Sequence, residues 1–399
     1  MLRFNPAIKV SRDGRLGDRL VARDNNDFAP RLGVAWSFDM GRNFAGRRRD
    51  ESNADFPDLT WDQPFRNLGA TIQINNPYVL GNIHQRRTPY SIQYLLNVQR
   101  ELDRQTVVEF GYMGSVSRKL ESLRAFNESL PGATGTVLDR APYPEFSRIQ
   151  EVDGSGKAHY DSLSVKLQRR FSQGLTYLVG YTFSKSIDTA SGIRNNGGDT
   201  LFPQNSYCIR CERGLSIFHF SHRLVTSTLY ELPLGKGKSF LNRGGVTNVL
   251  AGGWQLGSII TLQTGFPIIM GAGRDQSNTG SGNDRPNATG QKVALPRGQQ
   301  DPERFFNTDA FVLQPFGTFG NVGRNTLIGP GLISWDFSTL KNFAIREGHE
   351  LQFRFEAFNF PNHPNWGNPS TAVNNVNFGK IRGTRTSMRE LQFELQYVF

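Results

Sequence analysis

The cysteines Cys208 and Cys211 come closest to a known chemical motif in this sequence. A Cys-x-x-Cys pair can cycle between a dithiol and a disulfide, or it can supply half of a four-ligand zinc site. The sequence has 2 cysteines in all, so no second pair completes such a site. The simpler interpretations are a local disulfide within a loop and two ordinary thiols, and the sequence does not decide between these two.

Two further segments contain side chains that bind cations in other proteins. His219 and His222 are three residues apart, and on an extended strand they would point to opposite faces, so we expect surface histidines without a shared metal. The segment that starts at Asp275 begins like a calcium loop. Its twelfth position is Pro286, where such a loop needs a bidentate glutamate. Weak cation binding in a surface loop remains the alternative there.

No residue pattern indicates catalysis. Gly237-Lys238-Ser239 ends like a phosphate-binding loop, but Leu232 occupies the position of its first glycine, so a hairpin turn explains these residues better. The 35 acidic residues are dispersed, without a spacing that pairs two of them for acid–base chemistry. We therefore expect no catalytic residue, no metal site and no cofactor, and we expect that the protein is not an enzyme.

The composition is typical of strands that have one apolar face each. Aromatic residues make up 12% of the 399 residues, with 30 Phe, whereas hydrophobic residues total 37% and the mean hydropathy is −0.46. Gly accounts for 42 residues, above the usual share of roughly 7%. The net charge is +11, but Lys and Arg are scattered singly apart from Arg47–Arg49, so a nucleic-acid partner is not expected.

Alternation with a period of two residues is the main structural signal. In the last eleven residues, every second side chain from Leu391 to Phe399 is apolar, and the side chains between them are polar except for Val398. Because successive side chains of a strand point to opposite faces, such a segment is apolar on one side and hydrated on the other. The same pattern predicts strands at Ser91–Glu101, Thr106–Ser115, Ser162–Phe171, Leu175–Phe183, Trp254–Gln263 and His349–Phe358. Further strands are expected at Pro30–Phe38, Ser147–Asp153, His222–Leu232, Ile333–Phe343 and Phe378–Thr384.

The connections between these strands alternate in length. Short turns at Ser172–Gly174 and Arg346–His349 contrast with long polar stretches at Asp188–Phe220, Gly271–Phe305 and Pro361–Asn377. Transmembrane barrels combine short periplasmic turns with long outer loops in this way. Inside lipid every backbone polar group needs an internal partner, so membrane-spanning strands must close into a barrel. We therefore predict an all-β, transmembrane antiparallel β-barrel with about twelve to fourteen strands visible.

The sequence also resembles a known family, the Oar-like TonB-dependent receptors, in their barrel region. The similarity covers roughly residues 27 to 399 and is specific because its segments occur in the family's order. These segments are Asp27–Phe38, Arg87–Gly114, Tyr160–Asp188, Glu212–Lys238, Gly253–Phe266, Asn321–Pro330, Leu351–Pro369 and the terminal aromatic strand.

The resemblance implies a barrel of about twenty-two strands, a plug, and uptake of a large unidentified solute that is driven by the TonB complex. The alternate residues Phe393, Leu395, Tyr397 and Phe399 are similar to the C-terminal signal that the barrel-assembly machinery reads. We expect residues 1–399 to be a receptor-like barrel region without the plug or the N-terminal carboxypeptidase-regulatory-like domain, and without a signal peptide or TonB box. This predicts a fragment of a longer receptor, in which the TonB complex is a partner only if an upstream plug and TonB box exist.

Three functions are consistent with these patterns. The first is a receptor barrel in the cell outer membrane, in contact with outer-membrane lipid. The second is an adhesion or structural barrel that does not transport. The third is a soluble all-β enzyme such as a sandwich glycosidase, which would need paired carboxylates in a cleft. The sequence favours the first.

Overall fold

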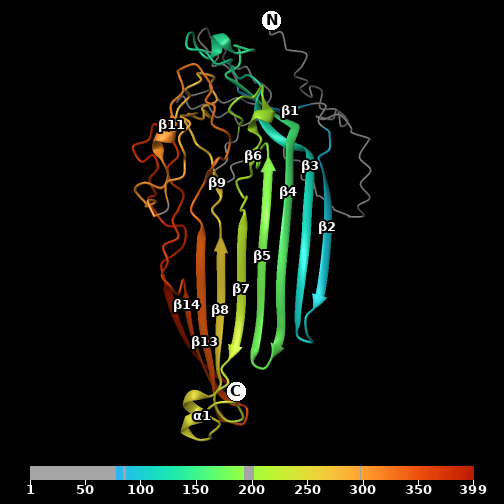
Figure 1. Ribbon diagram of the computed structural model, residues 1–399. Coiled ribbons are helices and arrows are strands. Elements are labelled where there is room, and N and C mark those ends of the chain that lie inside the picture. The colour runs from blue at the N-terminus through green and yellow to red at the C-terminus, as the bar shows by residue number, and fades with distance from the viewer. Residues whose placement is uncertain (1–77, 84–86, 193–201, 297) are drawn as a thin grey trace, which may run out of the picture.

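The computed structural model describes residues 78–83, 87–192, 202–296 and 298–399. The strand expected at Pro30–Phe38 lies outside these residues. In the described part, a single large sheet runs lengthwise through the molecule, and a group of long loops gathers at one of its ends (Figure 1). The helices are short, and none of those described is both long and apolar enough to cross a bilayer.

Nine antiparallel strands follow one another across the sheet, in the order β15-β14-β13-β8-β7-β5-β4-β3-β2. Their bounds are β2 Tyr90–Glu101, β3 Thr106–Ala125, β4 Arg148–Ser172, β5 Leu175–Asp188, β7 His222–Glu231, β8 Trp254–Gln263, β13 Leu332–Arg346, β14 His349–Phe358 and β15 Glu390–Val398. Two short strands join the sheet beside this path, β1 (Tyr78–Asn82) on β4 and β6 (Gly214–Leu215) on β5.

The remaining elements lie in the connections. Two small ribbons form between β9 (Pro267–Ile268) and β12 (Leu327–Ile328) and between β10 (Asn287–Ala288) and β11 (Phe311–Val312). The helices are α1 (Val246–Ala251), η1 (Leu138–Arg140), η2 (Ile209–Glu212) and η3 (Thr308–Ala310). The helix α1 lies in an uncharged segment of the sequence that directly precedes β8.

The period-two pattern predicted most of the sheet correctly. β8 and β14 have the predicted bounds, and the predicted starts of β2, β3, β5, β7, β13 and β15 agree with the observed ones within one or two residues. The strand predicted at Ser162–Phe171 is only the last part of β4, which begins at Arg148. Two predictions were wrong. Ser147–Asp153 is no separate strand, because it is the first part of the 25-residue β4. Phe378–Thr384 is no strand at all, because Phe378 turns inward to pack on the Phe306 ring.

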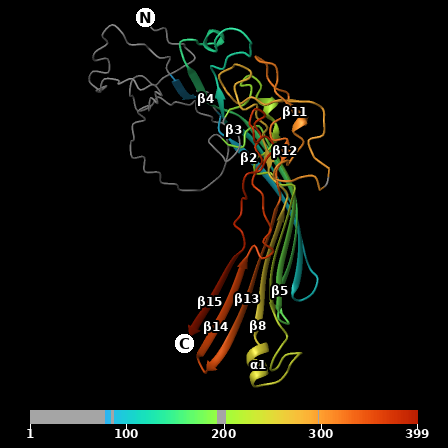
Figure 2. The same ribbon diagram turned by 90° about the vertical axis from the view of Figure 1, so that its left-hand side faces the viewer.

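Closure of the barrel was also expected, and the described residues instead form an open sheet. β2 and β15 are its two edges, and neither pairs with a second long strand or with the other edge. The described residues supply nine long strands, and the expected count of twelve to fourteen stays a prediction, because the strand expected at Pro30–Phe38 lies outside these residues. The sheet is curved, with β13, β14 and β15 turning away from the plane of β5 and β4 (Figures 1 and 2).

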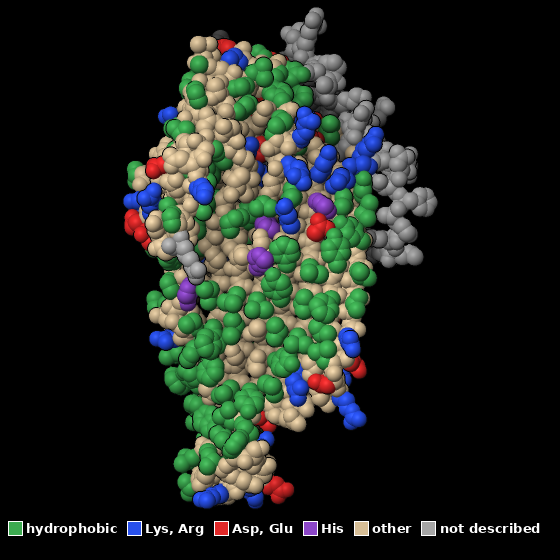
Figure 3. Space-filling view, viewed as in Figure 1, with side chains coloured by type: hydrophobic (Ala, Val, Ile, Leu, Met, Phe, Trp, Pro, Cys, Tyr) green, Lys and Arg blue, Asp and Glu red, His purple; other side chains and the backbone are tan. Residues whose placement is uncertain are grey.

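The register joins the apolar side chains of neighbouring strands into one continuous surface. Phe355 of β14 lies opposite Phe393 of β15, and their ring centroids are 5.0 Å apart. In the middle of the sheet, Val165 lies between Phe110 and Tyr181. This surface, here called the outer face, is on the convex side of the sheet, where apolar side chains cover the middle and lower strands (Figure 3). Polar side chains occupy the alternate positions and face the concave side.

Tight turns join the strands at the end opposite to the loops. Gln173 and Gly174 connect β4 and β5 with φ values of 53° and 80°. Positive φ at both positions is the type I′ geometry whose twist matches that of paired strands, and glycine adopts it without strain. The turn predicted at Ser172–Gly174 is confirmed. The residues after Leu232 form a longer connection that contains α1.

One lysine occupies the outer face near these turns. Lys341 of β13 is 1% exposed, and its ammonium group donates to the carbonyl oxygens of Leu250 and Gly252 at the end of α1. It also lies 5.0 Å from the ring centroids of both Trp254 and Phe343. Carbonyl oxygens at a helix end and aromatic faces both attract a cation, so the charge is compensated where water is excluded.

The long loops have a hydrophobic core of their own. Phe306 is 1% exposed and makes edge-to-face contacts with Phe311 and Phe378, with ring centroids 5.9 and 5.3 Å apart. Met270, Val322, Leu327 and Ile381 complete this cluster. These residues come from two long connections, β8 to β13 and β14 to β15, so the loops fold together into one body, called the loop cap below.

Candidate functional site

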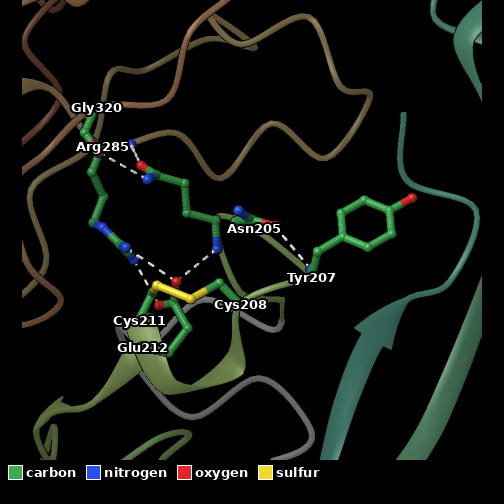
Figure 4. Close-up of a disulfide and its surroundings, with 8 residues drawn as sticks. Asn205, Tyr207, Cys208, Cys211, Glu212, Arg285 and Gly320 are labelled. Atoms are coloured by element: carbon green, nitrogen blue, oxygen red, sulfur yellow. Dashed lines mark hydrogen bonds and ion pairs between the residues drawn. A yellow bond between two sulfur atoms is a disulfide. The ribbon is translucent and has the colours of Figure 1, made fainter. Parts of the chain in front are cut away.

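A buried ion pair lies at the centre of the loop cap. Arg285 binds Glu212 through two hydrogen bonds, from Nη1 to Oε2 at 2.6 Å and from Nη2 to Oε1 at 3.1 Å. The side chains are 4% and 2% exposed. Figure 4 shows Arg285 reaching across from one loop to Glu212, which directly follows Cys211 at the end of η2. The two residues are 73 positions apart, so the pair ties two distant loops together.

Gln204 extends this network to a third segment. Its backbone amide donates to Glu212 Oε1 at 3.1 Å, and its side-chain Oε1 accepts from the Arg285 backbone amide at 2.6 Å. Its side-chain Nε2 donates to the carbonyl oxygen of Gly320 at 3.0 Å. Each of these polar groups is buried, and each has a partner. A buried network whose members are satisfied favours one defined arrangement of the loops.

A second buried pair joins the loop cap to the sheet. Arg324 binds the carboxylate of Asp188 at the end of β5, and both side chains are 2% exposed. The Arg324 Nε donates to the carbonyl oxygen of Glu212 at 2.8 Å. The loop cap is therefore attached to β5 through the same segment that carries Glu212. Composition did not reveal these pairs, because partners so far apart in sequence have no local signal.

Cys208 and Cys211 form a disulfide with their Cα atoms 5.3 Å apart, which decides between the two alternatives left open by the sequence. The turn is also held by Asn205, whose carbonyl oxygen accepts from the Cys208 amide at 3.0 Å. Figure 4 shows the disulfide next to Glu212, with Tyr207 pointing away from it. The Tyr207 hydroxyl donates to the backbone carbonyl of Glu128 at 2.6 Å.

Replacing both Cys208 and Cys211 by serine is expected to loosen the loop cap only locally. The disulfide closes a loop of four residues. For a loop of that size, the loss of chain entropy in the unfolded state stabilises the folded state by about 2 kcal/mol. Trypsin cleavage near Arg210 and Arg213 should become faster, while the amount of protein in the membrane fraction should not change. Loss of membrane insertion in this variant would contradict a local role.

Two buried carboxyls in the loop cap titrate abnormally. Burial raises the pKa of Glu128 above its ordinary value of 4.5, although the Ser206 amide donates to it at 2.6 Å. Burial, and to a smaller extent the charge of Asp275, raises the pKa of Asp284. Both groups lie outside the strands. Compared with the same groups in water, the folded structure shifts both carboxyls toward their neutral form.

The raised pKa of Glu128 predicts how the stability of the loop cap depends on pH. A folded-state pKa above the unfolded one contributes stability that is fully present below pH about 4.5 and is lost as the pH rises through the folded-state value. Glu128→Gln mimics the neutral form, keeps an acceptor for the Ser206 amide, and should stabilise the loop cap at pH 7. Protease protection measured from pH 4 to pH 8 should fall less steeply in this variant. An unchanged slope would exclude Glu128 as the cause.

One of the two histidines lies at the surface as expected, and the other is buried. His222 begins β7, and its Nδ1 is 2.8 Å from the Tyr181 hydroxyl. His219 was expected at the surface, but it is 5% exposed, because it lies in a turn before the strand and its Nδ1 accepts from the Ser186 amide at 3.2 Å. Burial lowers the pKa of His219, and the charge of Lys185 acts in the same direction.

The calcium-like segment is a set of tight turns. Asp275 accepts hydrogen bonds from the backbone amides of Thr279 and Gly280 at 3.0 and 2.7 Å, which uses its carboxylate within its own loop. In the described part of the chain, no group of three or more His, Cys, Asp or Glu residues is placed to hold a metal ion. The Gly237-Lys238-Ser239 segment forms a turn at the other end of the sheet, where Lys238 pairs with Glu231 at 3.2 Å.

The concave face of the sheet carries polar side chains. Lys166, Gln168 and Arg170 of β4 alternate along the strand and line a small pocket of about 90 Å³ together with Glu109 of β3. On the same face, near the β15 edge of the sheet, Arg354 and Glu394 pair at 3.5 Å with exposed side chains. This face can hold water and ions, in contrast to the apolar outer face.

Phe393, Leu395, Tyr397 and Phe399 were singled out as the C-terminal signal. Phe393, Leu395 and Tyr397 lie at alternate positions on the outer face of β15, the edge strand, and Phe399 directly follows it. All four are exposed, by 67%, 66%, 47% and 89%. Their recognition by the barrel-assembly machinery stays a prediction.

Comparison with known protein families agrees with this geometry. The family model described as "Outer membrane beta barrel domain" matches residues 43–392. This chain belongs to the outer membrane β-barrel domain family. The protein is located in the outer membrane. In outer-membrane barrels generally, the apolar face of the sheet contacts lipid and the polar face lines the lumen.

Several solved outer-membrane structures are similar to this barrel domain. The outer membrane transporter YddB from Escherichia coli is 11% identical with a TM-score of 0.43, and the match covers 81% of this chain and 34% of YddB. The siderophore receptor PiuA from Acinetobacter baumannii is 9% identical with a TM-score of 0.38, over 77% of this chain and 28% of PiuA.

The FrpB iron transporter from Neisseria meningitidis is 11% identical with a TM-score of 0.36, over 80% of this chain and 32% of FrpB. The chain thus spans about a third or less of the length of each of these proteins. No curated protein matches the sequence.

Proposed function

We propose that this chain is part of an Oar-like TonB-dependent receptor barrel, which in the complete protein takes up a large solute by energy-coupled transport. The observation that carries the proposal is the open, curved sheet with an apolar convex face and a polar concave face. Among the residues that the structure describes, the outer edges of β2 and β15 have no partner strand. Unpaired edges are not tolerated in lipid, so the complete barrel has more strands than these.

A barrel larger than this sheet suits a transporter of large solutes. Barrels of about eight strands are filled by their own side chains, whereas barrels of about twenty-two strands enclose a lumen wide enough for a plug. The loop cap supports the same function, because its buried ion pairs hold the loops in a fixed arrangement at the mouth of the lumen. Fixed loops can present binding groups without a large ordering cost.

The same proposal assigns the remaining roles. The TonB complex supplies energy through a plug and TonB box elsewhere in the complete protein, and the barrel-assembly machinery recognises the aromatic side chains up to Phe399. We infer no enzymatic activity, because the role of a receptor barrel in the outer membrane accounts for this domain. The chemical identity of the solute is left open by this proposal.

The proposal is tested in cells of the source organism. A strain that lacks the gene and the same strain with the gene restored are given a mixture of oligosaccharides and metal chelates, with and without a protonophore. A solute should disappear from the medium only when the gene is present and the inner membrane is energised. If the protein reaches the outer membrane and changes cell adhesion but no solute depends on it, an adhesion or structural barrel is the correct function instead.

A further inference from the structure

Three cations gather on the outer face just above its apolar part. Arg118 of β3, Lys157 of β4 and Lys185 of β5 lie on adjacent strands, close to the rows that join Ser117 with Ala158 and Asp161 with Lys185. Arg118 and Lys157 lie at nearly the same level, whereas Lys185 pairs with Asp161, roughly 13 Å further along β4 than Lys157. Neighbouring strands are about 5 Å apart, so the extended Lys and Arg side chains can converge on one phosphate group that lies between them. Figure 3 shows Lys and Arg side chains gathered above the apolar surface on this side of the sheet.

These cations have no carboxylate partner within the described residues. Arg118 donates through Nη1 to the backbone carbonyl oxygens of Ser117 and Ala158, at 3.0 and 3.4 Å. Asp161 is the carboxylate opposite Lys185 in the register, but it accepts hydrogen bonds from the Tyr112 and Tyr94 hydroxyls at 2.8 and 3.2 Å. Its other oxygen is 3.2 Å from the His159 ring. The positive charge of Arg118, Lys157 and Lys185, here called the rim, is therefore available to a ligand.

The level of this rim along the strands matches that of lipid headgroups. Tyr94 and Tyr112 lie directly below the cations, and Tyr181 and Phe183 continue the aromatic layer onto β5. Aromatic rings with a polar group are typical of the boundary between hydrocarbon and headgroups. Side chains one row further out therefore face the phosphate groups of the outer leaflet.

An apolar groove opens beside the rim. It has a volume of about 640 Å³ and lies between the upper ends of β5, β7, β8 and β13 and the loop cap. Tyr181, His222, Leu262, Phe305 and Trp366 are among its lining residues. The groove lies near these cations, because Lys185 is two residues from Phe183, whose ring centroid is 5.1 Å from that of the lining residue His222.

We propose that this surface binds one lipid of the outer leaflet that carries a headgroup phosphate, with the phosphate at Arg118, Lys157 and Lys185 and an acyl chain in the groove. Guanidinium and ammonium groups are the common phosphate ligands of proteins, and a groove of several hundred cubic ångströms suits an apolar ligand. The site lies on the central strands, so it does not depend on which strands pair with the outer edges of β2 and β15 in the complete barrel. It goes beyond the proposed transport function, because it concerns the lipid side of the barrel.

Binding of phosphatidic acid to the full chain in neutral detergent micelles tests this proposal, with phosphatidylcholine as the comparison lipid. The triple variant R118Q, K157Q and K185Q should weaken binding of phosphatidic acid by roughly tenfold or more, since each basic residue near a charged lipid contributes about 1 kcal/mol. The double variant K166Q and R170Q changes the opposite face of β4 and should leave binding within about twofold. Binding should also weaken as salt is raised.

The acyl-chain part is tested by Leu262→Trp, which fills the groove without changing charge and should weaken binding of phosphatidic acid as well. All variants are first checked for the heat-dependent gel mobility of a folded barrel. The proposal is overturned if the triple variant binds phosphatidic acid as the parent protein does, or if phosphatidylcholine binds equally well. Competition by inorganic phosphate at millimolar concentration would also overturn it, because the site would then recognise the free anion rather than a lipid.

Discussion

An arginine in place of Val165 is expected to prevent most of the protein from inserting into the outer membrane. Val165 lies on the outer face in the middle of β4, between Phe110 of β3 and Tyr181 of β5. An arginine that faces lipid at this depth costs about 2–4 kcal/mol, because no water or counter-charge is available there. The fraction of protein recovered in the outer membrane measures the effect, together with the urea midpoint of the protein that does insert.

The matched control for this variant is Ser164→Arg. Ser164 is the neighbouring residue of the same strand, and its side chain is on the concave face, with Gly111 of β3 opposite it. The added arginine would reach water in the lumen, so insertion should remain close to normal. Equal tolerance of arginine at both positions would show that the outer face is not turned to lipid.

Replacing Arg285 by alanine is expected to destabilise the loop cap by about 3–5 kcal/mol, because the variant leaves the buried carboxylate of Glu212 without its partner. Glu212 is 2% exposed, and its other contact at the carboxylate is the Gln204 amide at 3.1 Å. Limited proteolysis of the loops and the denaturant midpoint of their unfolding report this change. The sheet should remain inserted, since its hydrogen bonds do not involve Arg285.

A surface pair with a similar shortest N···O distance is the control. Arg382 Nη1 is 2.7 Å from Glu303 Oε1, but the side chains are 54% and 63% exposed. Arg382→Ala should therefore cost less than about 1 kcal/mol. The double variant Arg285→Met with Glu212→Leu should recover most of the lost stability, because an apolar pair replaces both buried charges. If R285A and R382A were equally stable, burial would not be what makes the first pair important.

The strands and their faces could be predicted from sequence because both are local properties. A side chain's face depends only on whether its position is odd or even, so the runs that end at Phe358 and Phe399 identified β14 and β15 and their apolar sides. The same reasoning found the turn at Gln173 and Gly174. The first part of β4 was predicted less well, because its residues alternate less regularly. Alternation is required only where one face of a strand meets hydrocarbon, and this part of β4 lies near the loops.

The loop cap could not be predicted, because its stability comes from contacts between residues far apart in the chain. Phe306 and Phe378 are isolated aromatic residues within polar stretches, and only folding brings their rings to 5.3 Å. Phe378 was therefore assigned to a strand. Glu212 and Arg285 likewise appear as ordinary surface charges until the loops bury them together.

The sequence by itself determined that this chain forms antiparallel strands with one apolar and one hydrated face, because the alternation of side chains is a property of each strand alone. The tertiary structure decided which strands are edges, that Cys208 and Cys211 are bonded, and that the loops have a core and buried ion pairs. It also placed Arg118, Lys157 and Lys185 on one rim. These features depend on strand register and on distances between separate segments, and a period-two pattern contains no information about either.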